Sequence, residues 1–364
     1  QNNYPHWAIY LLLFERFISI EYTVNMVDLK KYFNTALYFW RRNSWMFYVP
    51  GWFRALGVDR IDRPVFLLGN QGDGITLISR FLRRHEEVVS VSGNSDYWTG
   101  ADEMQRAMEY RLPKLLRLSG SLLGTDPKHS SLTMPRSWSY GCDELWESYH
   151  STEEDSCEKD RVGLKRAIGE CIHRYSRSTS ARFVDKSQVY TLKSRYIQSL
   201  LSESDPYFVL ITRDPYASCY RAAMGKAGDM ARYSSFLSFE ERFELCIQHW
   251  NNCMSTILKD SSDLNHFKHW RYEDFLSEPE KNTRELCEFI GLEFQESMLP
   301  AREHRIPFGT RYGDRWYPLR PDNNQSYFDK MTMEQFRQVE SGCGEIAKKL
   351  GYFIPSSAGA GEQV

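Results

Sequence analysis

The sequence has no strong excess of charge and no long apolar run. Its 364 residues carry a formal net charge of −2. Domains that bind nucleic acids are usually strongly basic, so we expect no nucleic acid partner. The early apolar run Trp7–Phe14 is far shorter than the about 20 residues of a membrane-spanning helix. It also lacks the basic segment and the small-residue cleavage site of a signal peptide. We therefore expect a cytoplasmic protein, with a Golgi-type lumen in a eukaryote as the alternative.

Metal-binding patterns are also missing. None of the eight cysteines forms a Cys-x-x-Cys pair, and no histidine stands at zinc-finger spacing from a pair of them. These absences argue against a metal site. The scattered cysteines are typical of free thiols in a reducing compartment, and a disulfide-bonded lumenal protein is the alternative.

Three regions of the chain differ in composition. Residues 1–57 interleave Trp, Tyr and Phe with Arg and Lys, which predicts a helical extension that packs on the main domain or makes a peripheral membrane contact. Residues 58–355 form the expected main domain, and residues 356–364 are small and polar, so we expect a disordered tail. The first methionine is Met26, which is an alternative start of the chain.

Short apolar runs alternate with helical patterns through the main domain. Five such runs predict strands, at Pro64–Gly69, Glu87–Gly93, Ala181–Ser187, Pro206–Pro215 and Phe267–Phe275. Alternation of strands with helices is typical of an α/β fold in three layers, with a central parallel sheet of about five strands. In such sheets ligands bind at the carboxyl ends of the strands. The segments to inspect are therefore residues 69–74, 93–96, 185–187, 213–214 and 272–274.

The first of these segments is a glycine-rich loop that opens a predicted helix. Gly69, Gly72 and Gly74 let the backbone approach an anion closely, and a helix start offers free N–H groups and the positive end of the helix dipole. The candidate anion contacts are Gly69, Gly72, Asp73, Gly74, Ile75, Thr76 and Leu77. A plain tight turn is the alternative. A P-loop kinase would carry Lys in the pattern G-x-x-x-x-G-K-[ST], and this loop contains neither Lys nor Arg.

Arg213 ends the most apolar of the predicted strands. A charged side chain at such a place needs an anionic partner, and the planar guanidinium suits a phosphate. A salt bridge to Asp214 or Glu273 is the alternative.

Taken in this order, the segments resemble the sulfotransferase family, which moves a sulfuryl group from 3'-phosphoadenosine-5'-phosphosulfate (PAPS) to a hydroxyl or an amine. The resemblance covers roughly Arg63 to Tyr352. The segments that carry it are FLLGNQGDGITLISRFL, RFVDKSQVY, FVLITRDPYASCYRA, WRYEDFLSEPEKNTRELCEFIGLEF and the close RWYPLR with GCGEIAKKLGY. The resemblance implies a P-loop-like fold, PAPS as co-substrate and no metal.

The resemblance also implies roles for single residues. It assigns the glycine loop to the 5'-phosphosulfate and Arg213 to the 3'-phosphate, with Arg221 or Ser218 as the partner of Arg213. It places Tyr272 against the adenine. It implies that one of Arg311, Arg315 and Arg320 closes over the 3'-phosphate, and we take Arg315 as the candidate.

The glycine loop departs from the family's pattern. Gly72 stands where the family has Arg or Lys, and Asp73 stands where it has Ser. We expect the Asp73 carboxylate to cap the helix N-terminus and to repel the anion. Because charge builds on the leaving oxygen during transfer, either another cation substitutes or the site is inactive. Lys186 is our candidate for that cation, and an ordinary surface lysine is the alternative.

The acceptor hydroxyl needs a general base within hydrogen-bond reach. Asp96 and Glu103 are the candidates, with His85 and His173 as lesser ones. The aromatic residues Tyr97, Trp98 and Trp138 are candidates for a platform under a sugar ring, and core packing is the alternative. Likeness to the carbohydrate-type branch implies a carbohydrate or glycolipid acceptor. The alternatives are a non-catalytic relative that binds a nucleotide, a glycan or a partner and, further off, a P-loop kinase.

Overall fold

The computed structural model describes residues 61–91, 93–94, 103–104, 139–176, 180–225, 233–234, 236–301 and 319–354. The predicted extension at residues 1–57 and the predicted tail at 356–364 lie outside the described residues, as do Asp96, Tyr97, Trp98, Trp138, Arg311 and Arg315.

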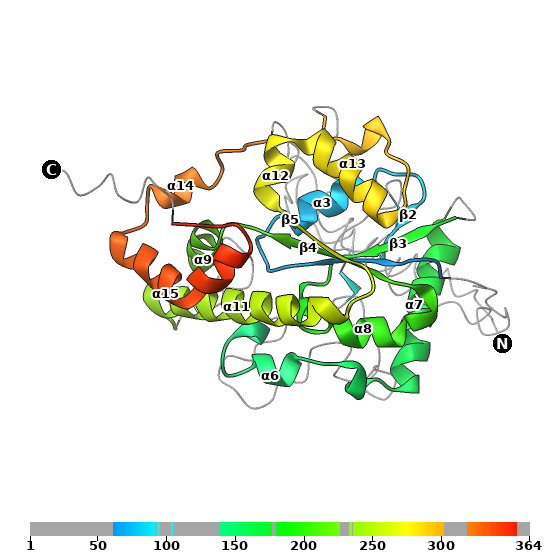
Figure 1. Ribbon diagram of the computed structural model, residues 1–364, viewed down its shortest axis with the longest axis horizontal. Helices are drawn as coiled ribbons and strands as arrows, with labels where there is room; N and C mark the ends of the chain where they lie inside the picture. The colour runs from blue at the N-terminus through cyan, green and yellow to red at the C-terminus, as the bar shows by residue number, and fades with distance from the viewer. Residues whose placement is uncertain are drawn as a thin grey trace, which may run out of the picture.

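A five-stranded sheet forms the centre of the molecule (Figure 1). Its strands lie in the order β2-β3-β1-β4-β5, and every neighbouring pair is parallel. The strands are β1 (Val65–Leu68), β2 (Val88–Val89), β3 (Arg182–Asp185), β4 (Tyr207–Thr212) and β5 (Phe267–Arg271). The predicted α/β fold with a central parallel sheet is confirmed.

All five strands are shorter than predicted, and the second and the fifth each end early for a local reason. The second one ends at Val89, because Ser90 turns back and pairs with Gly93. The fifth one ends at Arg271, because Tyr272 begins a helix with Glu273 and Asp274 in its first turn. Acidic residues favour that position, since the helix N-terminus carries a partial positive charge.

Helices cover both faces of the sheet and divide the core into two clusters. On one face lie α3 (Ile75–Leu82), α12 (Tyr272–Ser277) and α13 (Pro279–Ile290), above the sheet in Figure 1. Alternate residues of β1 supply each cluster: Val65 and Leu67 face these helices, and Phe66 and Leu68 face the other side. This alternation follows from the two-residue period of a strand.

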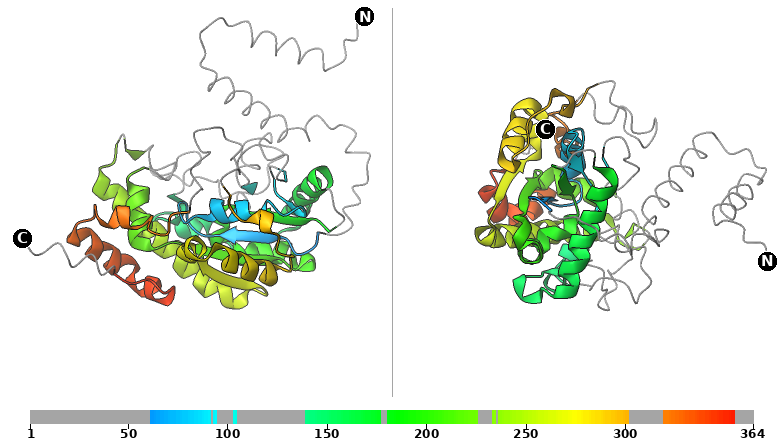
Figure 2. Two further views of the ribbon diagram at one scale, coloured as in Figure 1. Left: turned by 90° about the horizontal axis from the view of Figure 1, so that it is seen from above. Right: turned by 90° about the vertical axis from the view of Figure 1, so that its right-hand side faces the viewer.

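The opposite face carries the three longest helices of the described residues and two shorter ones. These are α7 (Glu158–Tyr175), α8 (Ser194–Leu200), α9 (Pro215–Ala223), α11 (Phe239–Asp260) and α15 (Met333–Lys349). Figure 2 shows the sheet and its helices from above and from the side. Helix α11 packs against α9 and α15, and the short helix α14 (Gln325–Phe328) also lies against α9.

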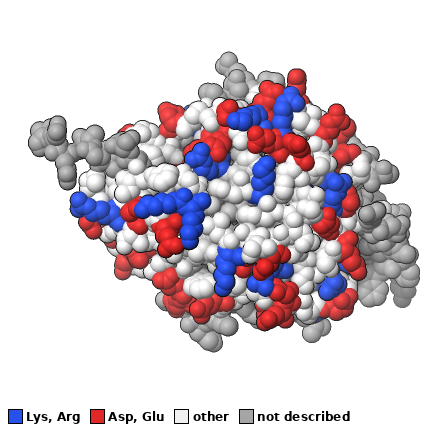
Figure 3. Space-filling view, viewed as in Figure 1, with Lys and Arg blue, Asp and Glu red and all other residues white. Residues whose placement is uncertain are grey.

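Shorter helical segments connect these elements. They are η3 (Ser139–Gly141), α6 (Trp146–Tyr149), η4 (Glu153–Asp155), η5 (Gln188–Leu192), η6 (Ser202–Ser204), η7 (Ser261–Asp263) and η8 (Glu296–Met298). On the face drawn in Figure 3, acidic and basic side chains of the described residues are interspersed around an uncharged centre.

Candidate active site

The glycine loop follows the central strand β1, so strands on both sides bring their ends to it. Gly69, Gly72 and Gly74 have φ values of 134°, 102° and 87°, which side chains with a Cβ rarely adopt. The backbone N–H of Gly69 donates to Thr191 Oγ1 at 2.8 Å. A Cβ at Gly69 would overlap the carbonyl oxygen of Ile211, and a Cβ at Gly74 would overlap the ring of Tyr272. The loop therefore packs closely against the end of β4 and the start of α12.

Asp73 does not cap the helix, contrary to our expectation. Helix α3 begins at Ile75 with Gly74 as its N-cap and has no side-chain cap. The left-handed turns at Gly72 and Gly74 direct the carboxylate back into the loop. There Asp73 Oδ2 accepts from the backbone N–H of Asn70 at 3.0 Å, and Oδ1 accepts from Ser218 Oγ at 2.7 Å. The start of α3 therefore has no side-chain cap, and the Asp73 carboxyl lies beneath it.

The Asp73 carboxyl is fully buried. Burial raises its pKa to about 7, because desolvation disfavours the charged form more than the hydrogen bonds from Ser218 and Asn70 and the charge of Arg213 favour it. Within the described residues, Asp73 forms no ion pair. A carboxyl in this state is poised to change its charge near neutral pH.

Arg213 lies at the end of β4, on one side of the loop, and is only 2% exposed. Its Nε donates to Asn324 Oδ1 at 2.8 Å, and its Nη1 donates to the carbonyl oxygen of Gly72 at 3.3 Å. The guanidinium carbon lies 5.2 Å from the ring centre of Tyr272 and 5.5 Å from that of Tyr327.

The remaining nitrogen of this fork has no partner. Arg213 Nη2 is buried and makes no hydrogen bond. Among the described residues no carboxylate forms an ion pair with Arg213, so the alternative of a salt bridge to Asp214 or Glu273 is wrong. A buried cation with an unused donor is costly unless an anion completes its contacts.

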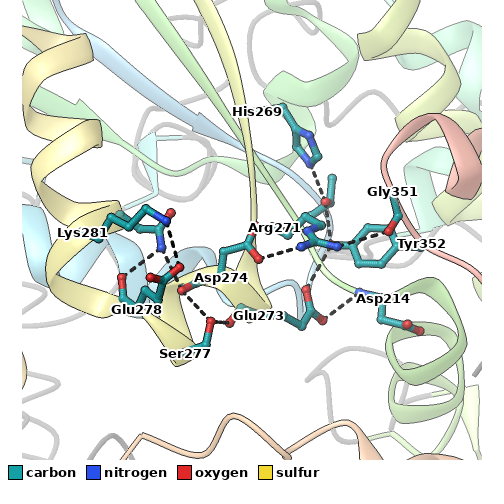
Figure 4. A network of polar contacts seen from close by, with 12 residues as sticks. Asp214, His269, Arg271, Glu273, Asp274, Ser277, Glu278, Lys281, Gly351 and Tyr352 are labelled. Carbon is teal, nitrogen blue, oxygen red and sulfur yellow. Dashed lines mark hydrogen bonds and ion pairs between the residues drawn. The ribbon is translucent and has the colours of Figure 1, made fainter.

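A polar network holds the Arg213 end of the site in place. Asn324 Nδ2 donates to Glu273 Oε1 at 2.6 Å, and the same oxygen accepts from the backbone N–H of Asp214 at 3.0 Å. Glu273 Oε2 accepts from the Tyr352 hydroxyl at 3.1 Å. Figure 4 shows how Asp214, Glu273 and Tyr352 converge from α9, α12 and the chain after α15. Because Asn324 donates with its nitrogen, its oxygen is fixed toward Arg213.

The network extends from Tyr352 to Thr212, the last residue of β4, and to His269 in the middle of β5. Thr212 Oγ1 lies 2.9 Å from the Tyr352 hydroxyl and 2.7 Å from His269 Nε2. Burial lowers the pKa of His269 to about 4, with the charge of Arg271 acting in the same direction. The histidine is therefore neutral at physiological pH and serves as a hydrogen-bonding partner.

Sequence reasoning missed Asn324, Tyr327 and the role of Glu273 in this network. The resemblance placed one of the closing arginines over the 3'-phosphate. Of those, Arg320 is exposed, and the contact with Arg213 comes from Asn324 instead. No local pattern marks an asparagine in a loop as the partner of a residue so far away in the chain.

Lys186 lies on the other side of the glycine loop, at the end of β3. Its Nζ donates to Glu103 Oε1 at 2.7 Å, and both side chains are buried. Lys186 is thus not an ordinary surface lysine. The structure brings together the residue predicted to be the substitute cation and one of the two predicted bases.

Asp185 positions this pair. Its Oδ1 accepts from the backbone N–H of Met104 at 2.6 Å, and its Oδ2 accepts from that of Ser187 at 2.9 Å. One carboxylate therefore fastens the segment that carries Glu103 to the turn that carries Lys186. The sequence placed Asp185 among the strand-end residues to inspect but indicated no role for it.

The other candidates occupy varied places. Ser218 and Arg221 lie one turn apart on α9, Ser218 buried and bonded to Asp73, Arg221 half-buried. Thr76 is half-buried near the start of α3, while the side chains of Ile75 and Leu77 lie in the core.

Tyr272 packs against Gly74 and is buried. His85 lies beyond the far end of α3 and His173 is exposed on α7, so neither joins the site.

A small pocket lies behind the loop, between the loop and helices α9 and α11. Its lining includes Asn70, Gln71, Ser218, Ala222 and Trp250. The side-chain amide of Asn70 and the Nε1 of Trp250 are buried and make no hydrogen bond. The pocket has a volume of about 10 Å³, which suits one ordered water beside these polar groups rather than a larger ligand.

The cysteines are free thiols, as the sequence indicated. None of the eight forms a disulfide, and Cys157 is the exposed one.

In the described ranges no group of three or more His, Cys, Asp or Glu side chains is arranged to hold a metal ion. Over the same residues, no helix has the length and apolar character needed to cross a membrane.

Comparison with known proteins identifies the family of the chain. The model of the sulfotransferase family matches residues 64–296, which is more than half of the sequence. No curated protein matches the chain by sequence.

The solved structures that are similar to it include three sulfotransferases. The sulfotransferase STF9 from Mycobacterium avium shares 13% identity at a TM-score of 0.49, over 86% of this chain and 82% of that chain. The sulfotransferase domain from the curacin biosynthetic pathway shares 16% identity at a TM-score of 0.48, over 81% and 100%. Mouse sulfotransferase SULT7A1, complexed with PAP, shares 10% identity at a TM-score of 0.42, over 79% and 85%. On the match of the family model, the chain belongs to the sulfotransferase family.

Proposed function

We propose that the protein binds PAPS and transfers its sulfuryl group to a hydroxyl of a carbohydrate or glycolipid acceptor. One observation carries the choice of donor: Arg213 is a buried cation whose Nη2 has no partner. A 3'-phosphate offers this fork the anion that it lacks, and a charged hydrogen bond of this kind contributes about 1.5–3 kcal/mol.

The two anionic ends of the donor fit two different elements. The fork of Arg213 would hold the 3'-phosphate, and Asn324 would fix the orientation of the guanidinium through its hydrogen bond with Nε. The uncapped start of α3 and the backbone of the glycine loop would hold the 5'-phosphosulfate. Tyr272, between Gly74 and Arg213, supplies an aromatic surface next to both.

Lys186 and Glu103 are the residues that we assign to the transfer itself. When the donor is bound, the acceptor oxygen attacks its sulfur and the bond from sulfur to the phosphate oxygen breaks. Lys186 would stabilise the charge that develops on the leaving oxygen. Glu103 would accept the proton of the acceptor hydroxyl. Their contact at 2.7 Å gives each buried group a partner of opposite charge.

The choice of a carbohydrate or glycolipid acceptor follows the resemblance of the chain to the carbohydrate-type branch of the family, which the segments of the sequence carry.

A second function has its own support. Gly72 and Asp73 leave the loop without a cation, and a buried carboxyl takes its place. These residues favour a relative that binds the nucleotide and does not turn it over.

Incubation with sulfur-labelled PAPS and a panel of sugar and glycolipid acceptors tests the proposal. We expect labelled acceptor, and we expect Lys186→Met to reduce its formation by at least ~100-fold, the scale of losing one group that stabilises a developing anion. Binding of adenosine 3',5'-bisphosphate without any transfer would support the second function. Absence of both binding and transfer would contradict both functions, and magnesium-dependent turnover of ATP would point to a kinase.

A further inference from the structure

Asp73 places a buried carboxyl at the point where this fold would bind an anion. The acid is fully buried under the uncapped start of α3, between Gly72 and Gly74. The fork of Arg213 faces the same loop, since its Nη1 donates to the carbonyl oxygen of Gly72 and its buried Nη2 has no partner. The loop thus combines a cation that needs an anion with an acid that would repel one.

The hydrogen bonds of Asp73 accommodate both of its protonation states. As a carboxylate, Asp73 accepts from the N–H of Asn70 and from the hydroxyl of Ser218. As a carboxylic acid, it can donate through Oδ1 to the same Ser218 oxygen, because a hydroxyl both donates and accepts. The separation of 2.7 Å suits an O–H···O bond in either direction.

Charged groups of both signs act on Asp73. Among the described residues, the ionisable groups that act on it from the neighbouring elements are Arg213 after β4, Cys219 on α9, Cys253 on α11, Glu273 on α12 and Tyr352 after α15. Burial raises the pKa values of Cys219, Cys253 and Tyr352 well above their ordinary range, so these three are neutral. Arg213 and Glu273 remain, with opposite charges. Among the described residues, burial outweighs the charge of Arg213, which Glu273 opposes, so the carboxylate form of Asp73 is disfavoured.

We infer that binding of the nucleotide is coupled to the uptake of one proton at Asp73. A proton from solvent joins the carboxylate, the hydroxyl of Ser218 turns from donor to acceptor, and the loop receives the 5'-anion with a neutral acid in place of a carboxylate. This inference rests on the proposed function. It makes Asp73 a residue that selects the charge state in which the site accepts its ligand.

The coupling predicts a specific dependence on pH. The pKa of Asp73 in the free protein is raised to about 7 by burial, so above this pH the proton must be supplied during binding. Affinity should then fall by about tenfold per pH unit, the slope of one linked proton. The ligand contributes little to this slope above pH ~7, because the second phosphate pKa is about 6.

Titration calorimetry with adenosine 3',5'-bisphosphate tests the inference. The affinity is measured between pH 7 and 9, and at pH 8 in two buffers that differ in their enthalpy of ionisation. We expect the tenfold slope and the uptake of close to one proton at pH 8. In Asp73→Asn, the neutral isostere, both should vanish and the affinity should depend little on pH. Binding by the natural protein without uptake, or uptake that persists in Asp73→Asn, would overturn the inference and leave the proposed function intact. Absence of binding at every pH would overturn both.

Ser218→Ala provides a second test that keeps the acid. The hydroxyl of Ser218 lowers the pKa of Asp73, so its removal should move the pH above which affinity falls to a higher value. An unmoved pH profile in a folded Ser218→Ala protein would contradict the assignment of the proton to Asp73.

Discussion

The two ends of the site differ in how they meet an anion. At the β4 end, Arg213 is fixed by Asn324 and Gly72 and keeps one donor unused. At the β1 end, the glycine backbone and the helix start are open, but Asp73 lies buried beneath them. In our proposal the first end would attract a phosphate at any physiological pH, because a guanidinium stays protonated. The second end would do so only after its acid is neutralised.

If the loop binds the 5'-anion as we propose, the difference means that an anion site can keep its shape while its electrostatics change. Gly69, Gly72 and Gly74 retain the left-handed turns of a cradle, although the cation expected there is missing. Cations instead stand on both flanks, Arg213 after β4 and Lys186 after β3. The predictions below separate the contributions of these positions.

The largest effect should come from breaking the buried pair that flanks the loop. Lys186→Met leaves Glu103 buried without its cation, and we expect a loss of ~3–5 kcal/mol in the free energy of unfolding. The double variant Lys186→Met, Glu103→Gln should recover most of it. Chemical denaturation measures both, with the exposed Lys159→Met as control. A loss in Lys186→Met no larger than in the control would show that the pair is not a buried unit.

Removal of the Arg213 guanidinium at the other end should weaken binding of the nucleotide more than it destabilises the fold. We expect Arg213→Ala to reduce the free energy of binding adenosine 3',5'-bisphosphate by ~1.5–3 kcal/mol, the scale of a charged hydrogen bond. Arg213→Lys keeps the charge and loses the fork, so it should recover part of the affinity. Calorimetry measures these values, and Arg337→Ala on the exposed face of α15 is the control. Equal affinities in all four proteins would place the phosphate elsewhere.

The acid at the loop should make stability depend on pH. Burial raises the pKa of Asp73 from 3.8 to about 7, so its contribution is fully present below the unfolded value and is lost as the pH rises toward 7. Between pH 5 and 6.5 we expect the natural protein to lose about 2 kcal/mol relative to Asp73→Asn, at about 1.4 kcal/mol for each unit. Asp214 has a similarly raised pKa, but it is common to both proteins. Parallel stability curves would show that Asp73 does not titrate in this range.

The smallest effect should come from the residue that orients Arg213. Asn324→Ala removes one neutral partner of the guanidinium, and we expect a loss of ~0.5–1.5 kcal/mol in nucleotide binding. Asn324→Asp keeps an oxygen toward Arg213 but places a second acid beside Glu273, so its affinity should be no better. An Asn324→Ala protein that binds as tightly as the natural one would leave Arg213 oriented by Gly72 alone.

Much of this architecture can be predicted from the sequence, because it depends on local patterns. The apolar runs identified all five strands, and Gly291, with a φ of 67°, ends α13 where the pattern placed a helix stop. Arg213 was identified because an apolar strand that ends in a cation needs an anion nearby. The glycine spacing likewise predicted the turns of the loop.

The rest depends on contacts between distant segments. The direction of the Asp73 side chain follows from the turns at Gly72 and Gly74 and from Ser218 on another helix, so its expected role as a helix cap was wrong. Two contacts of the site join segments that lie far apart in the sequence, and no periodic pattern predicts such a contact. They are the hydrogen bond from Arg213 to Asn324 and the ion pair of Lys186 with Glu103. Roles for Asp96 and Arg315 stay predictions.

The most direct test of the account is a comparison of two ligands on two proteins. Adenosine 3',5'-bisphosphate and adenosine 5'-monophosphate differ only in the 3'-phosphate, and the natural protein and Arg213→Ala differ only in the fork. We expect the 3'-phosphate to strengthen binding by ~10–150-fold in the natural protein and by little in Arg213→Ala. The same gain in both proteins would contradict the assignment of Arg213 to the 3'-phosphate, and with it the donor that we propose.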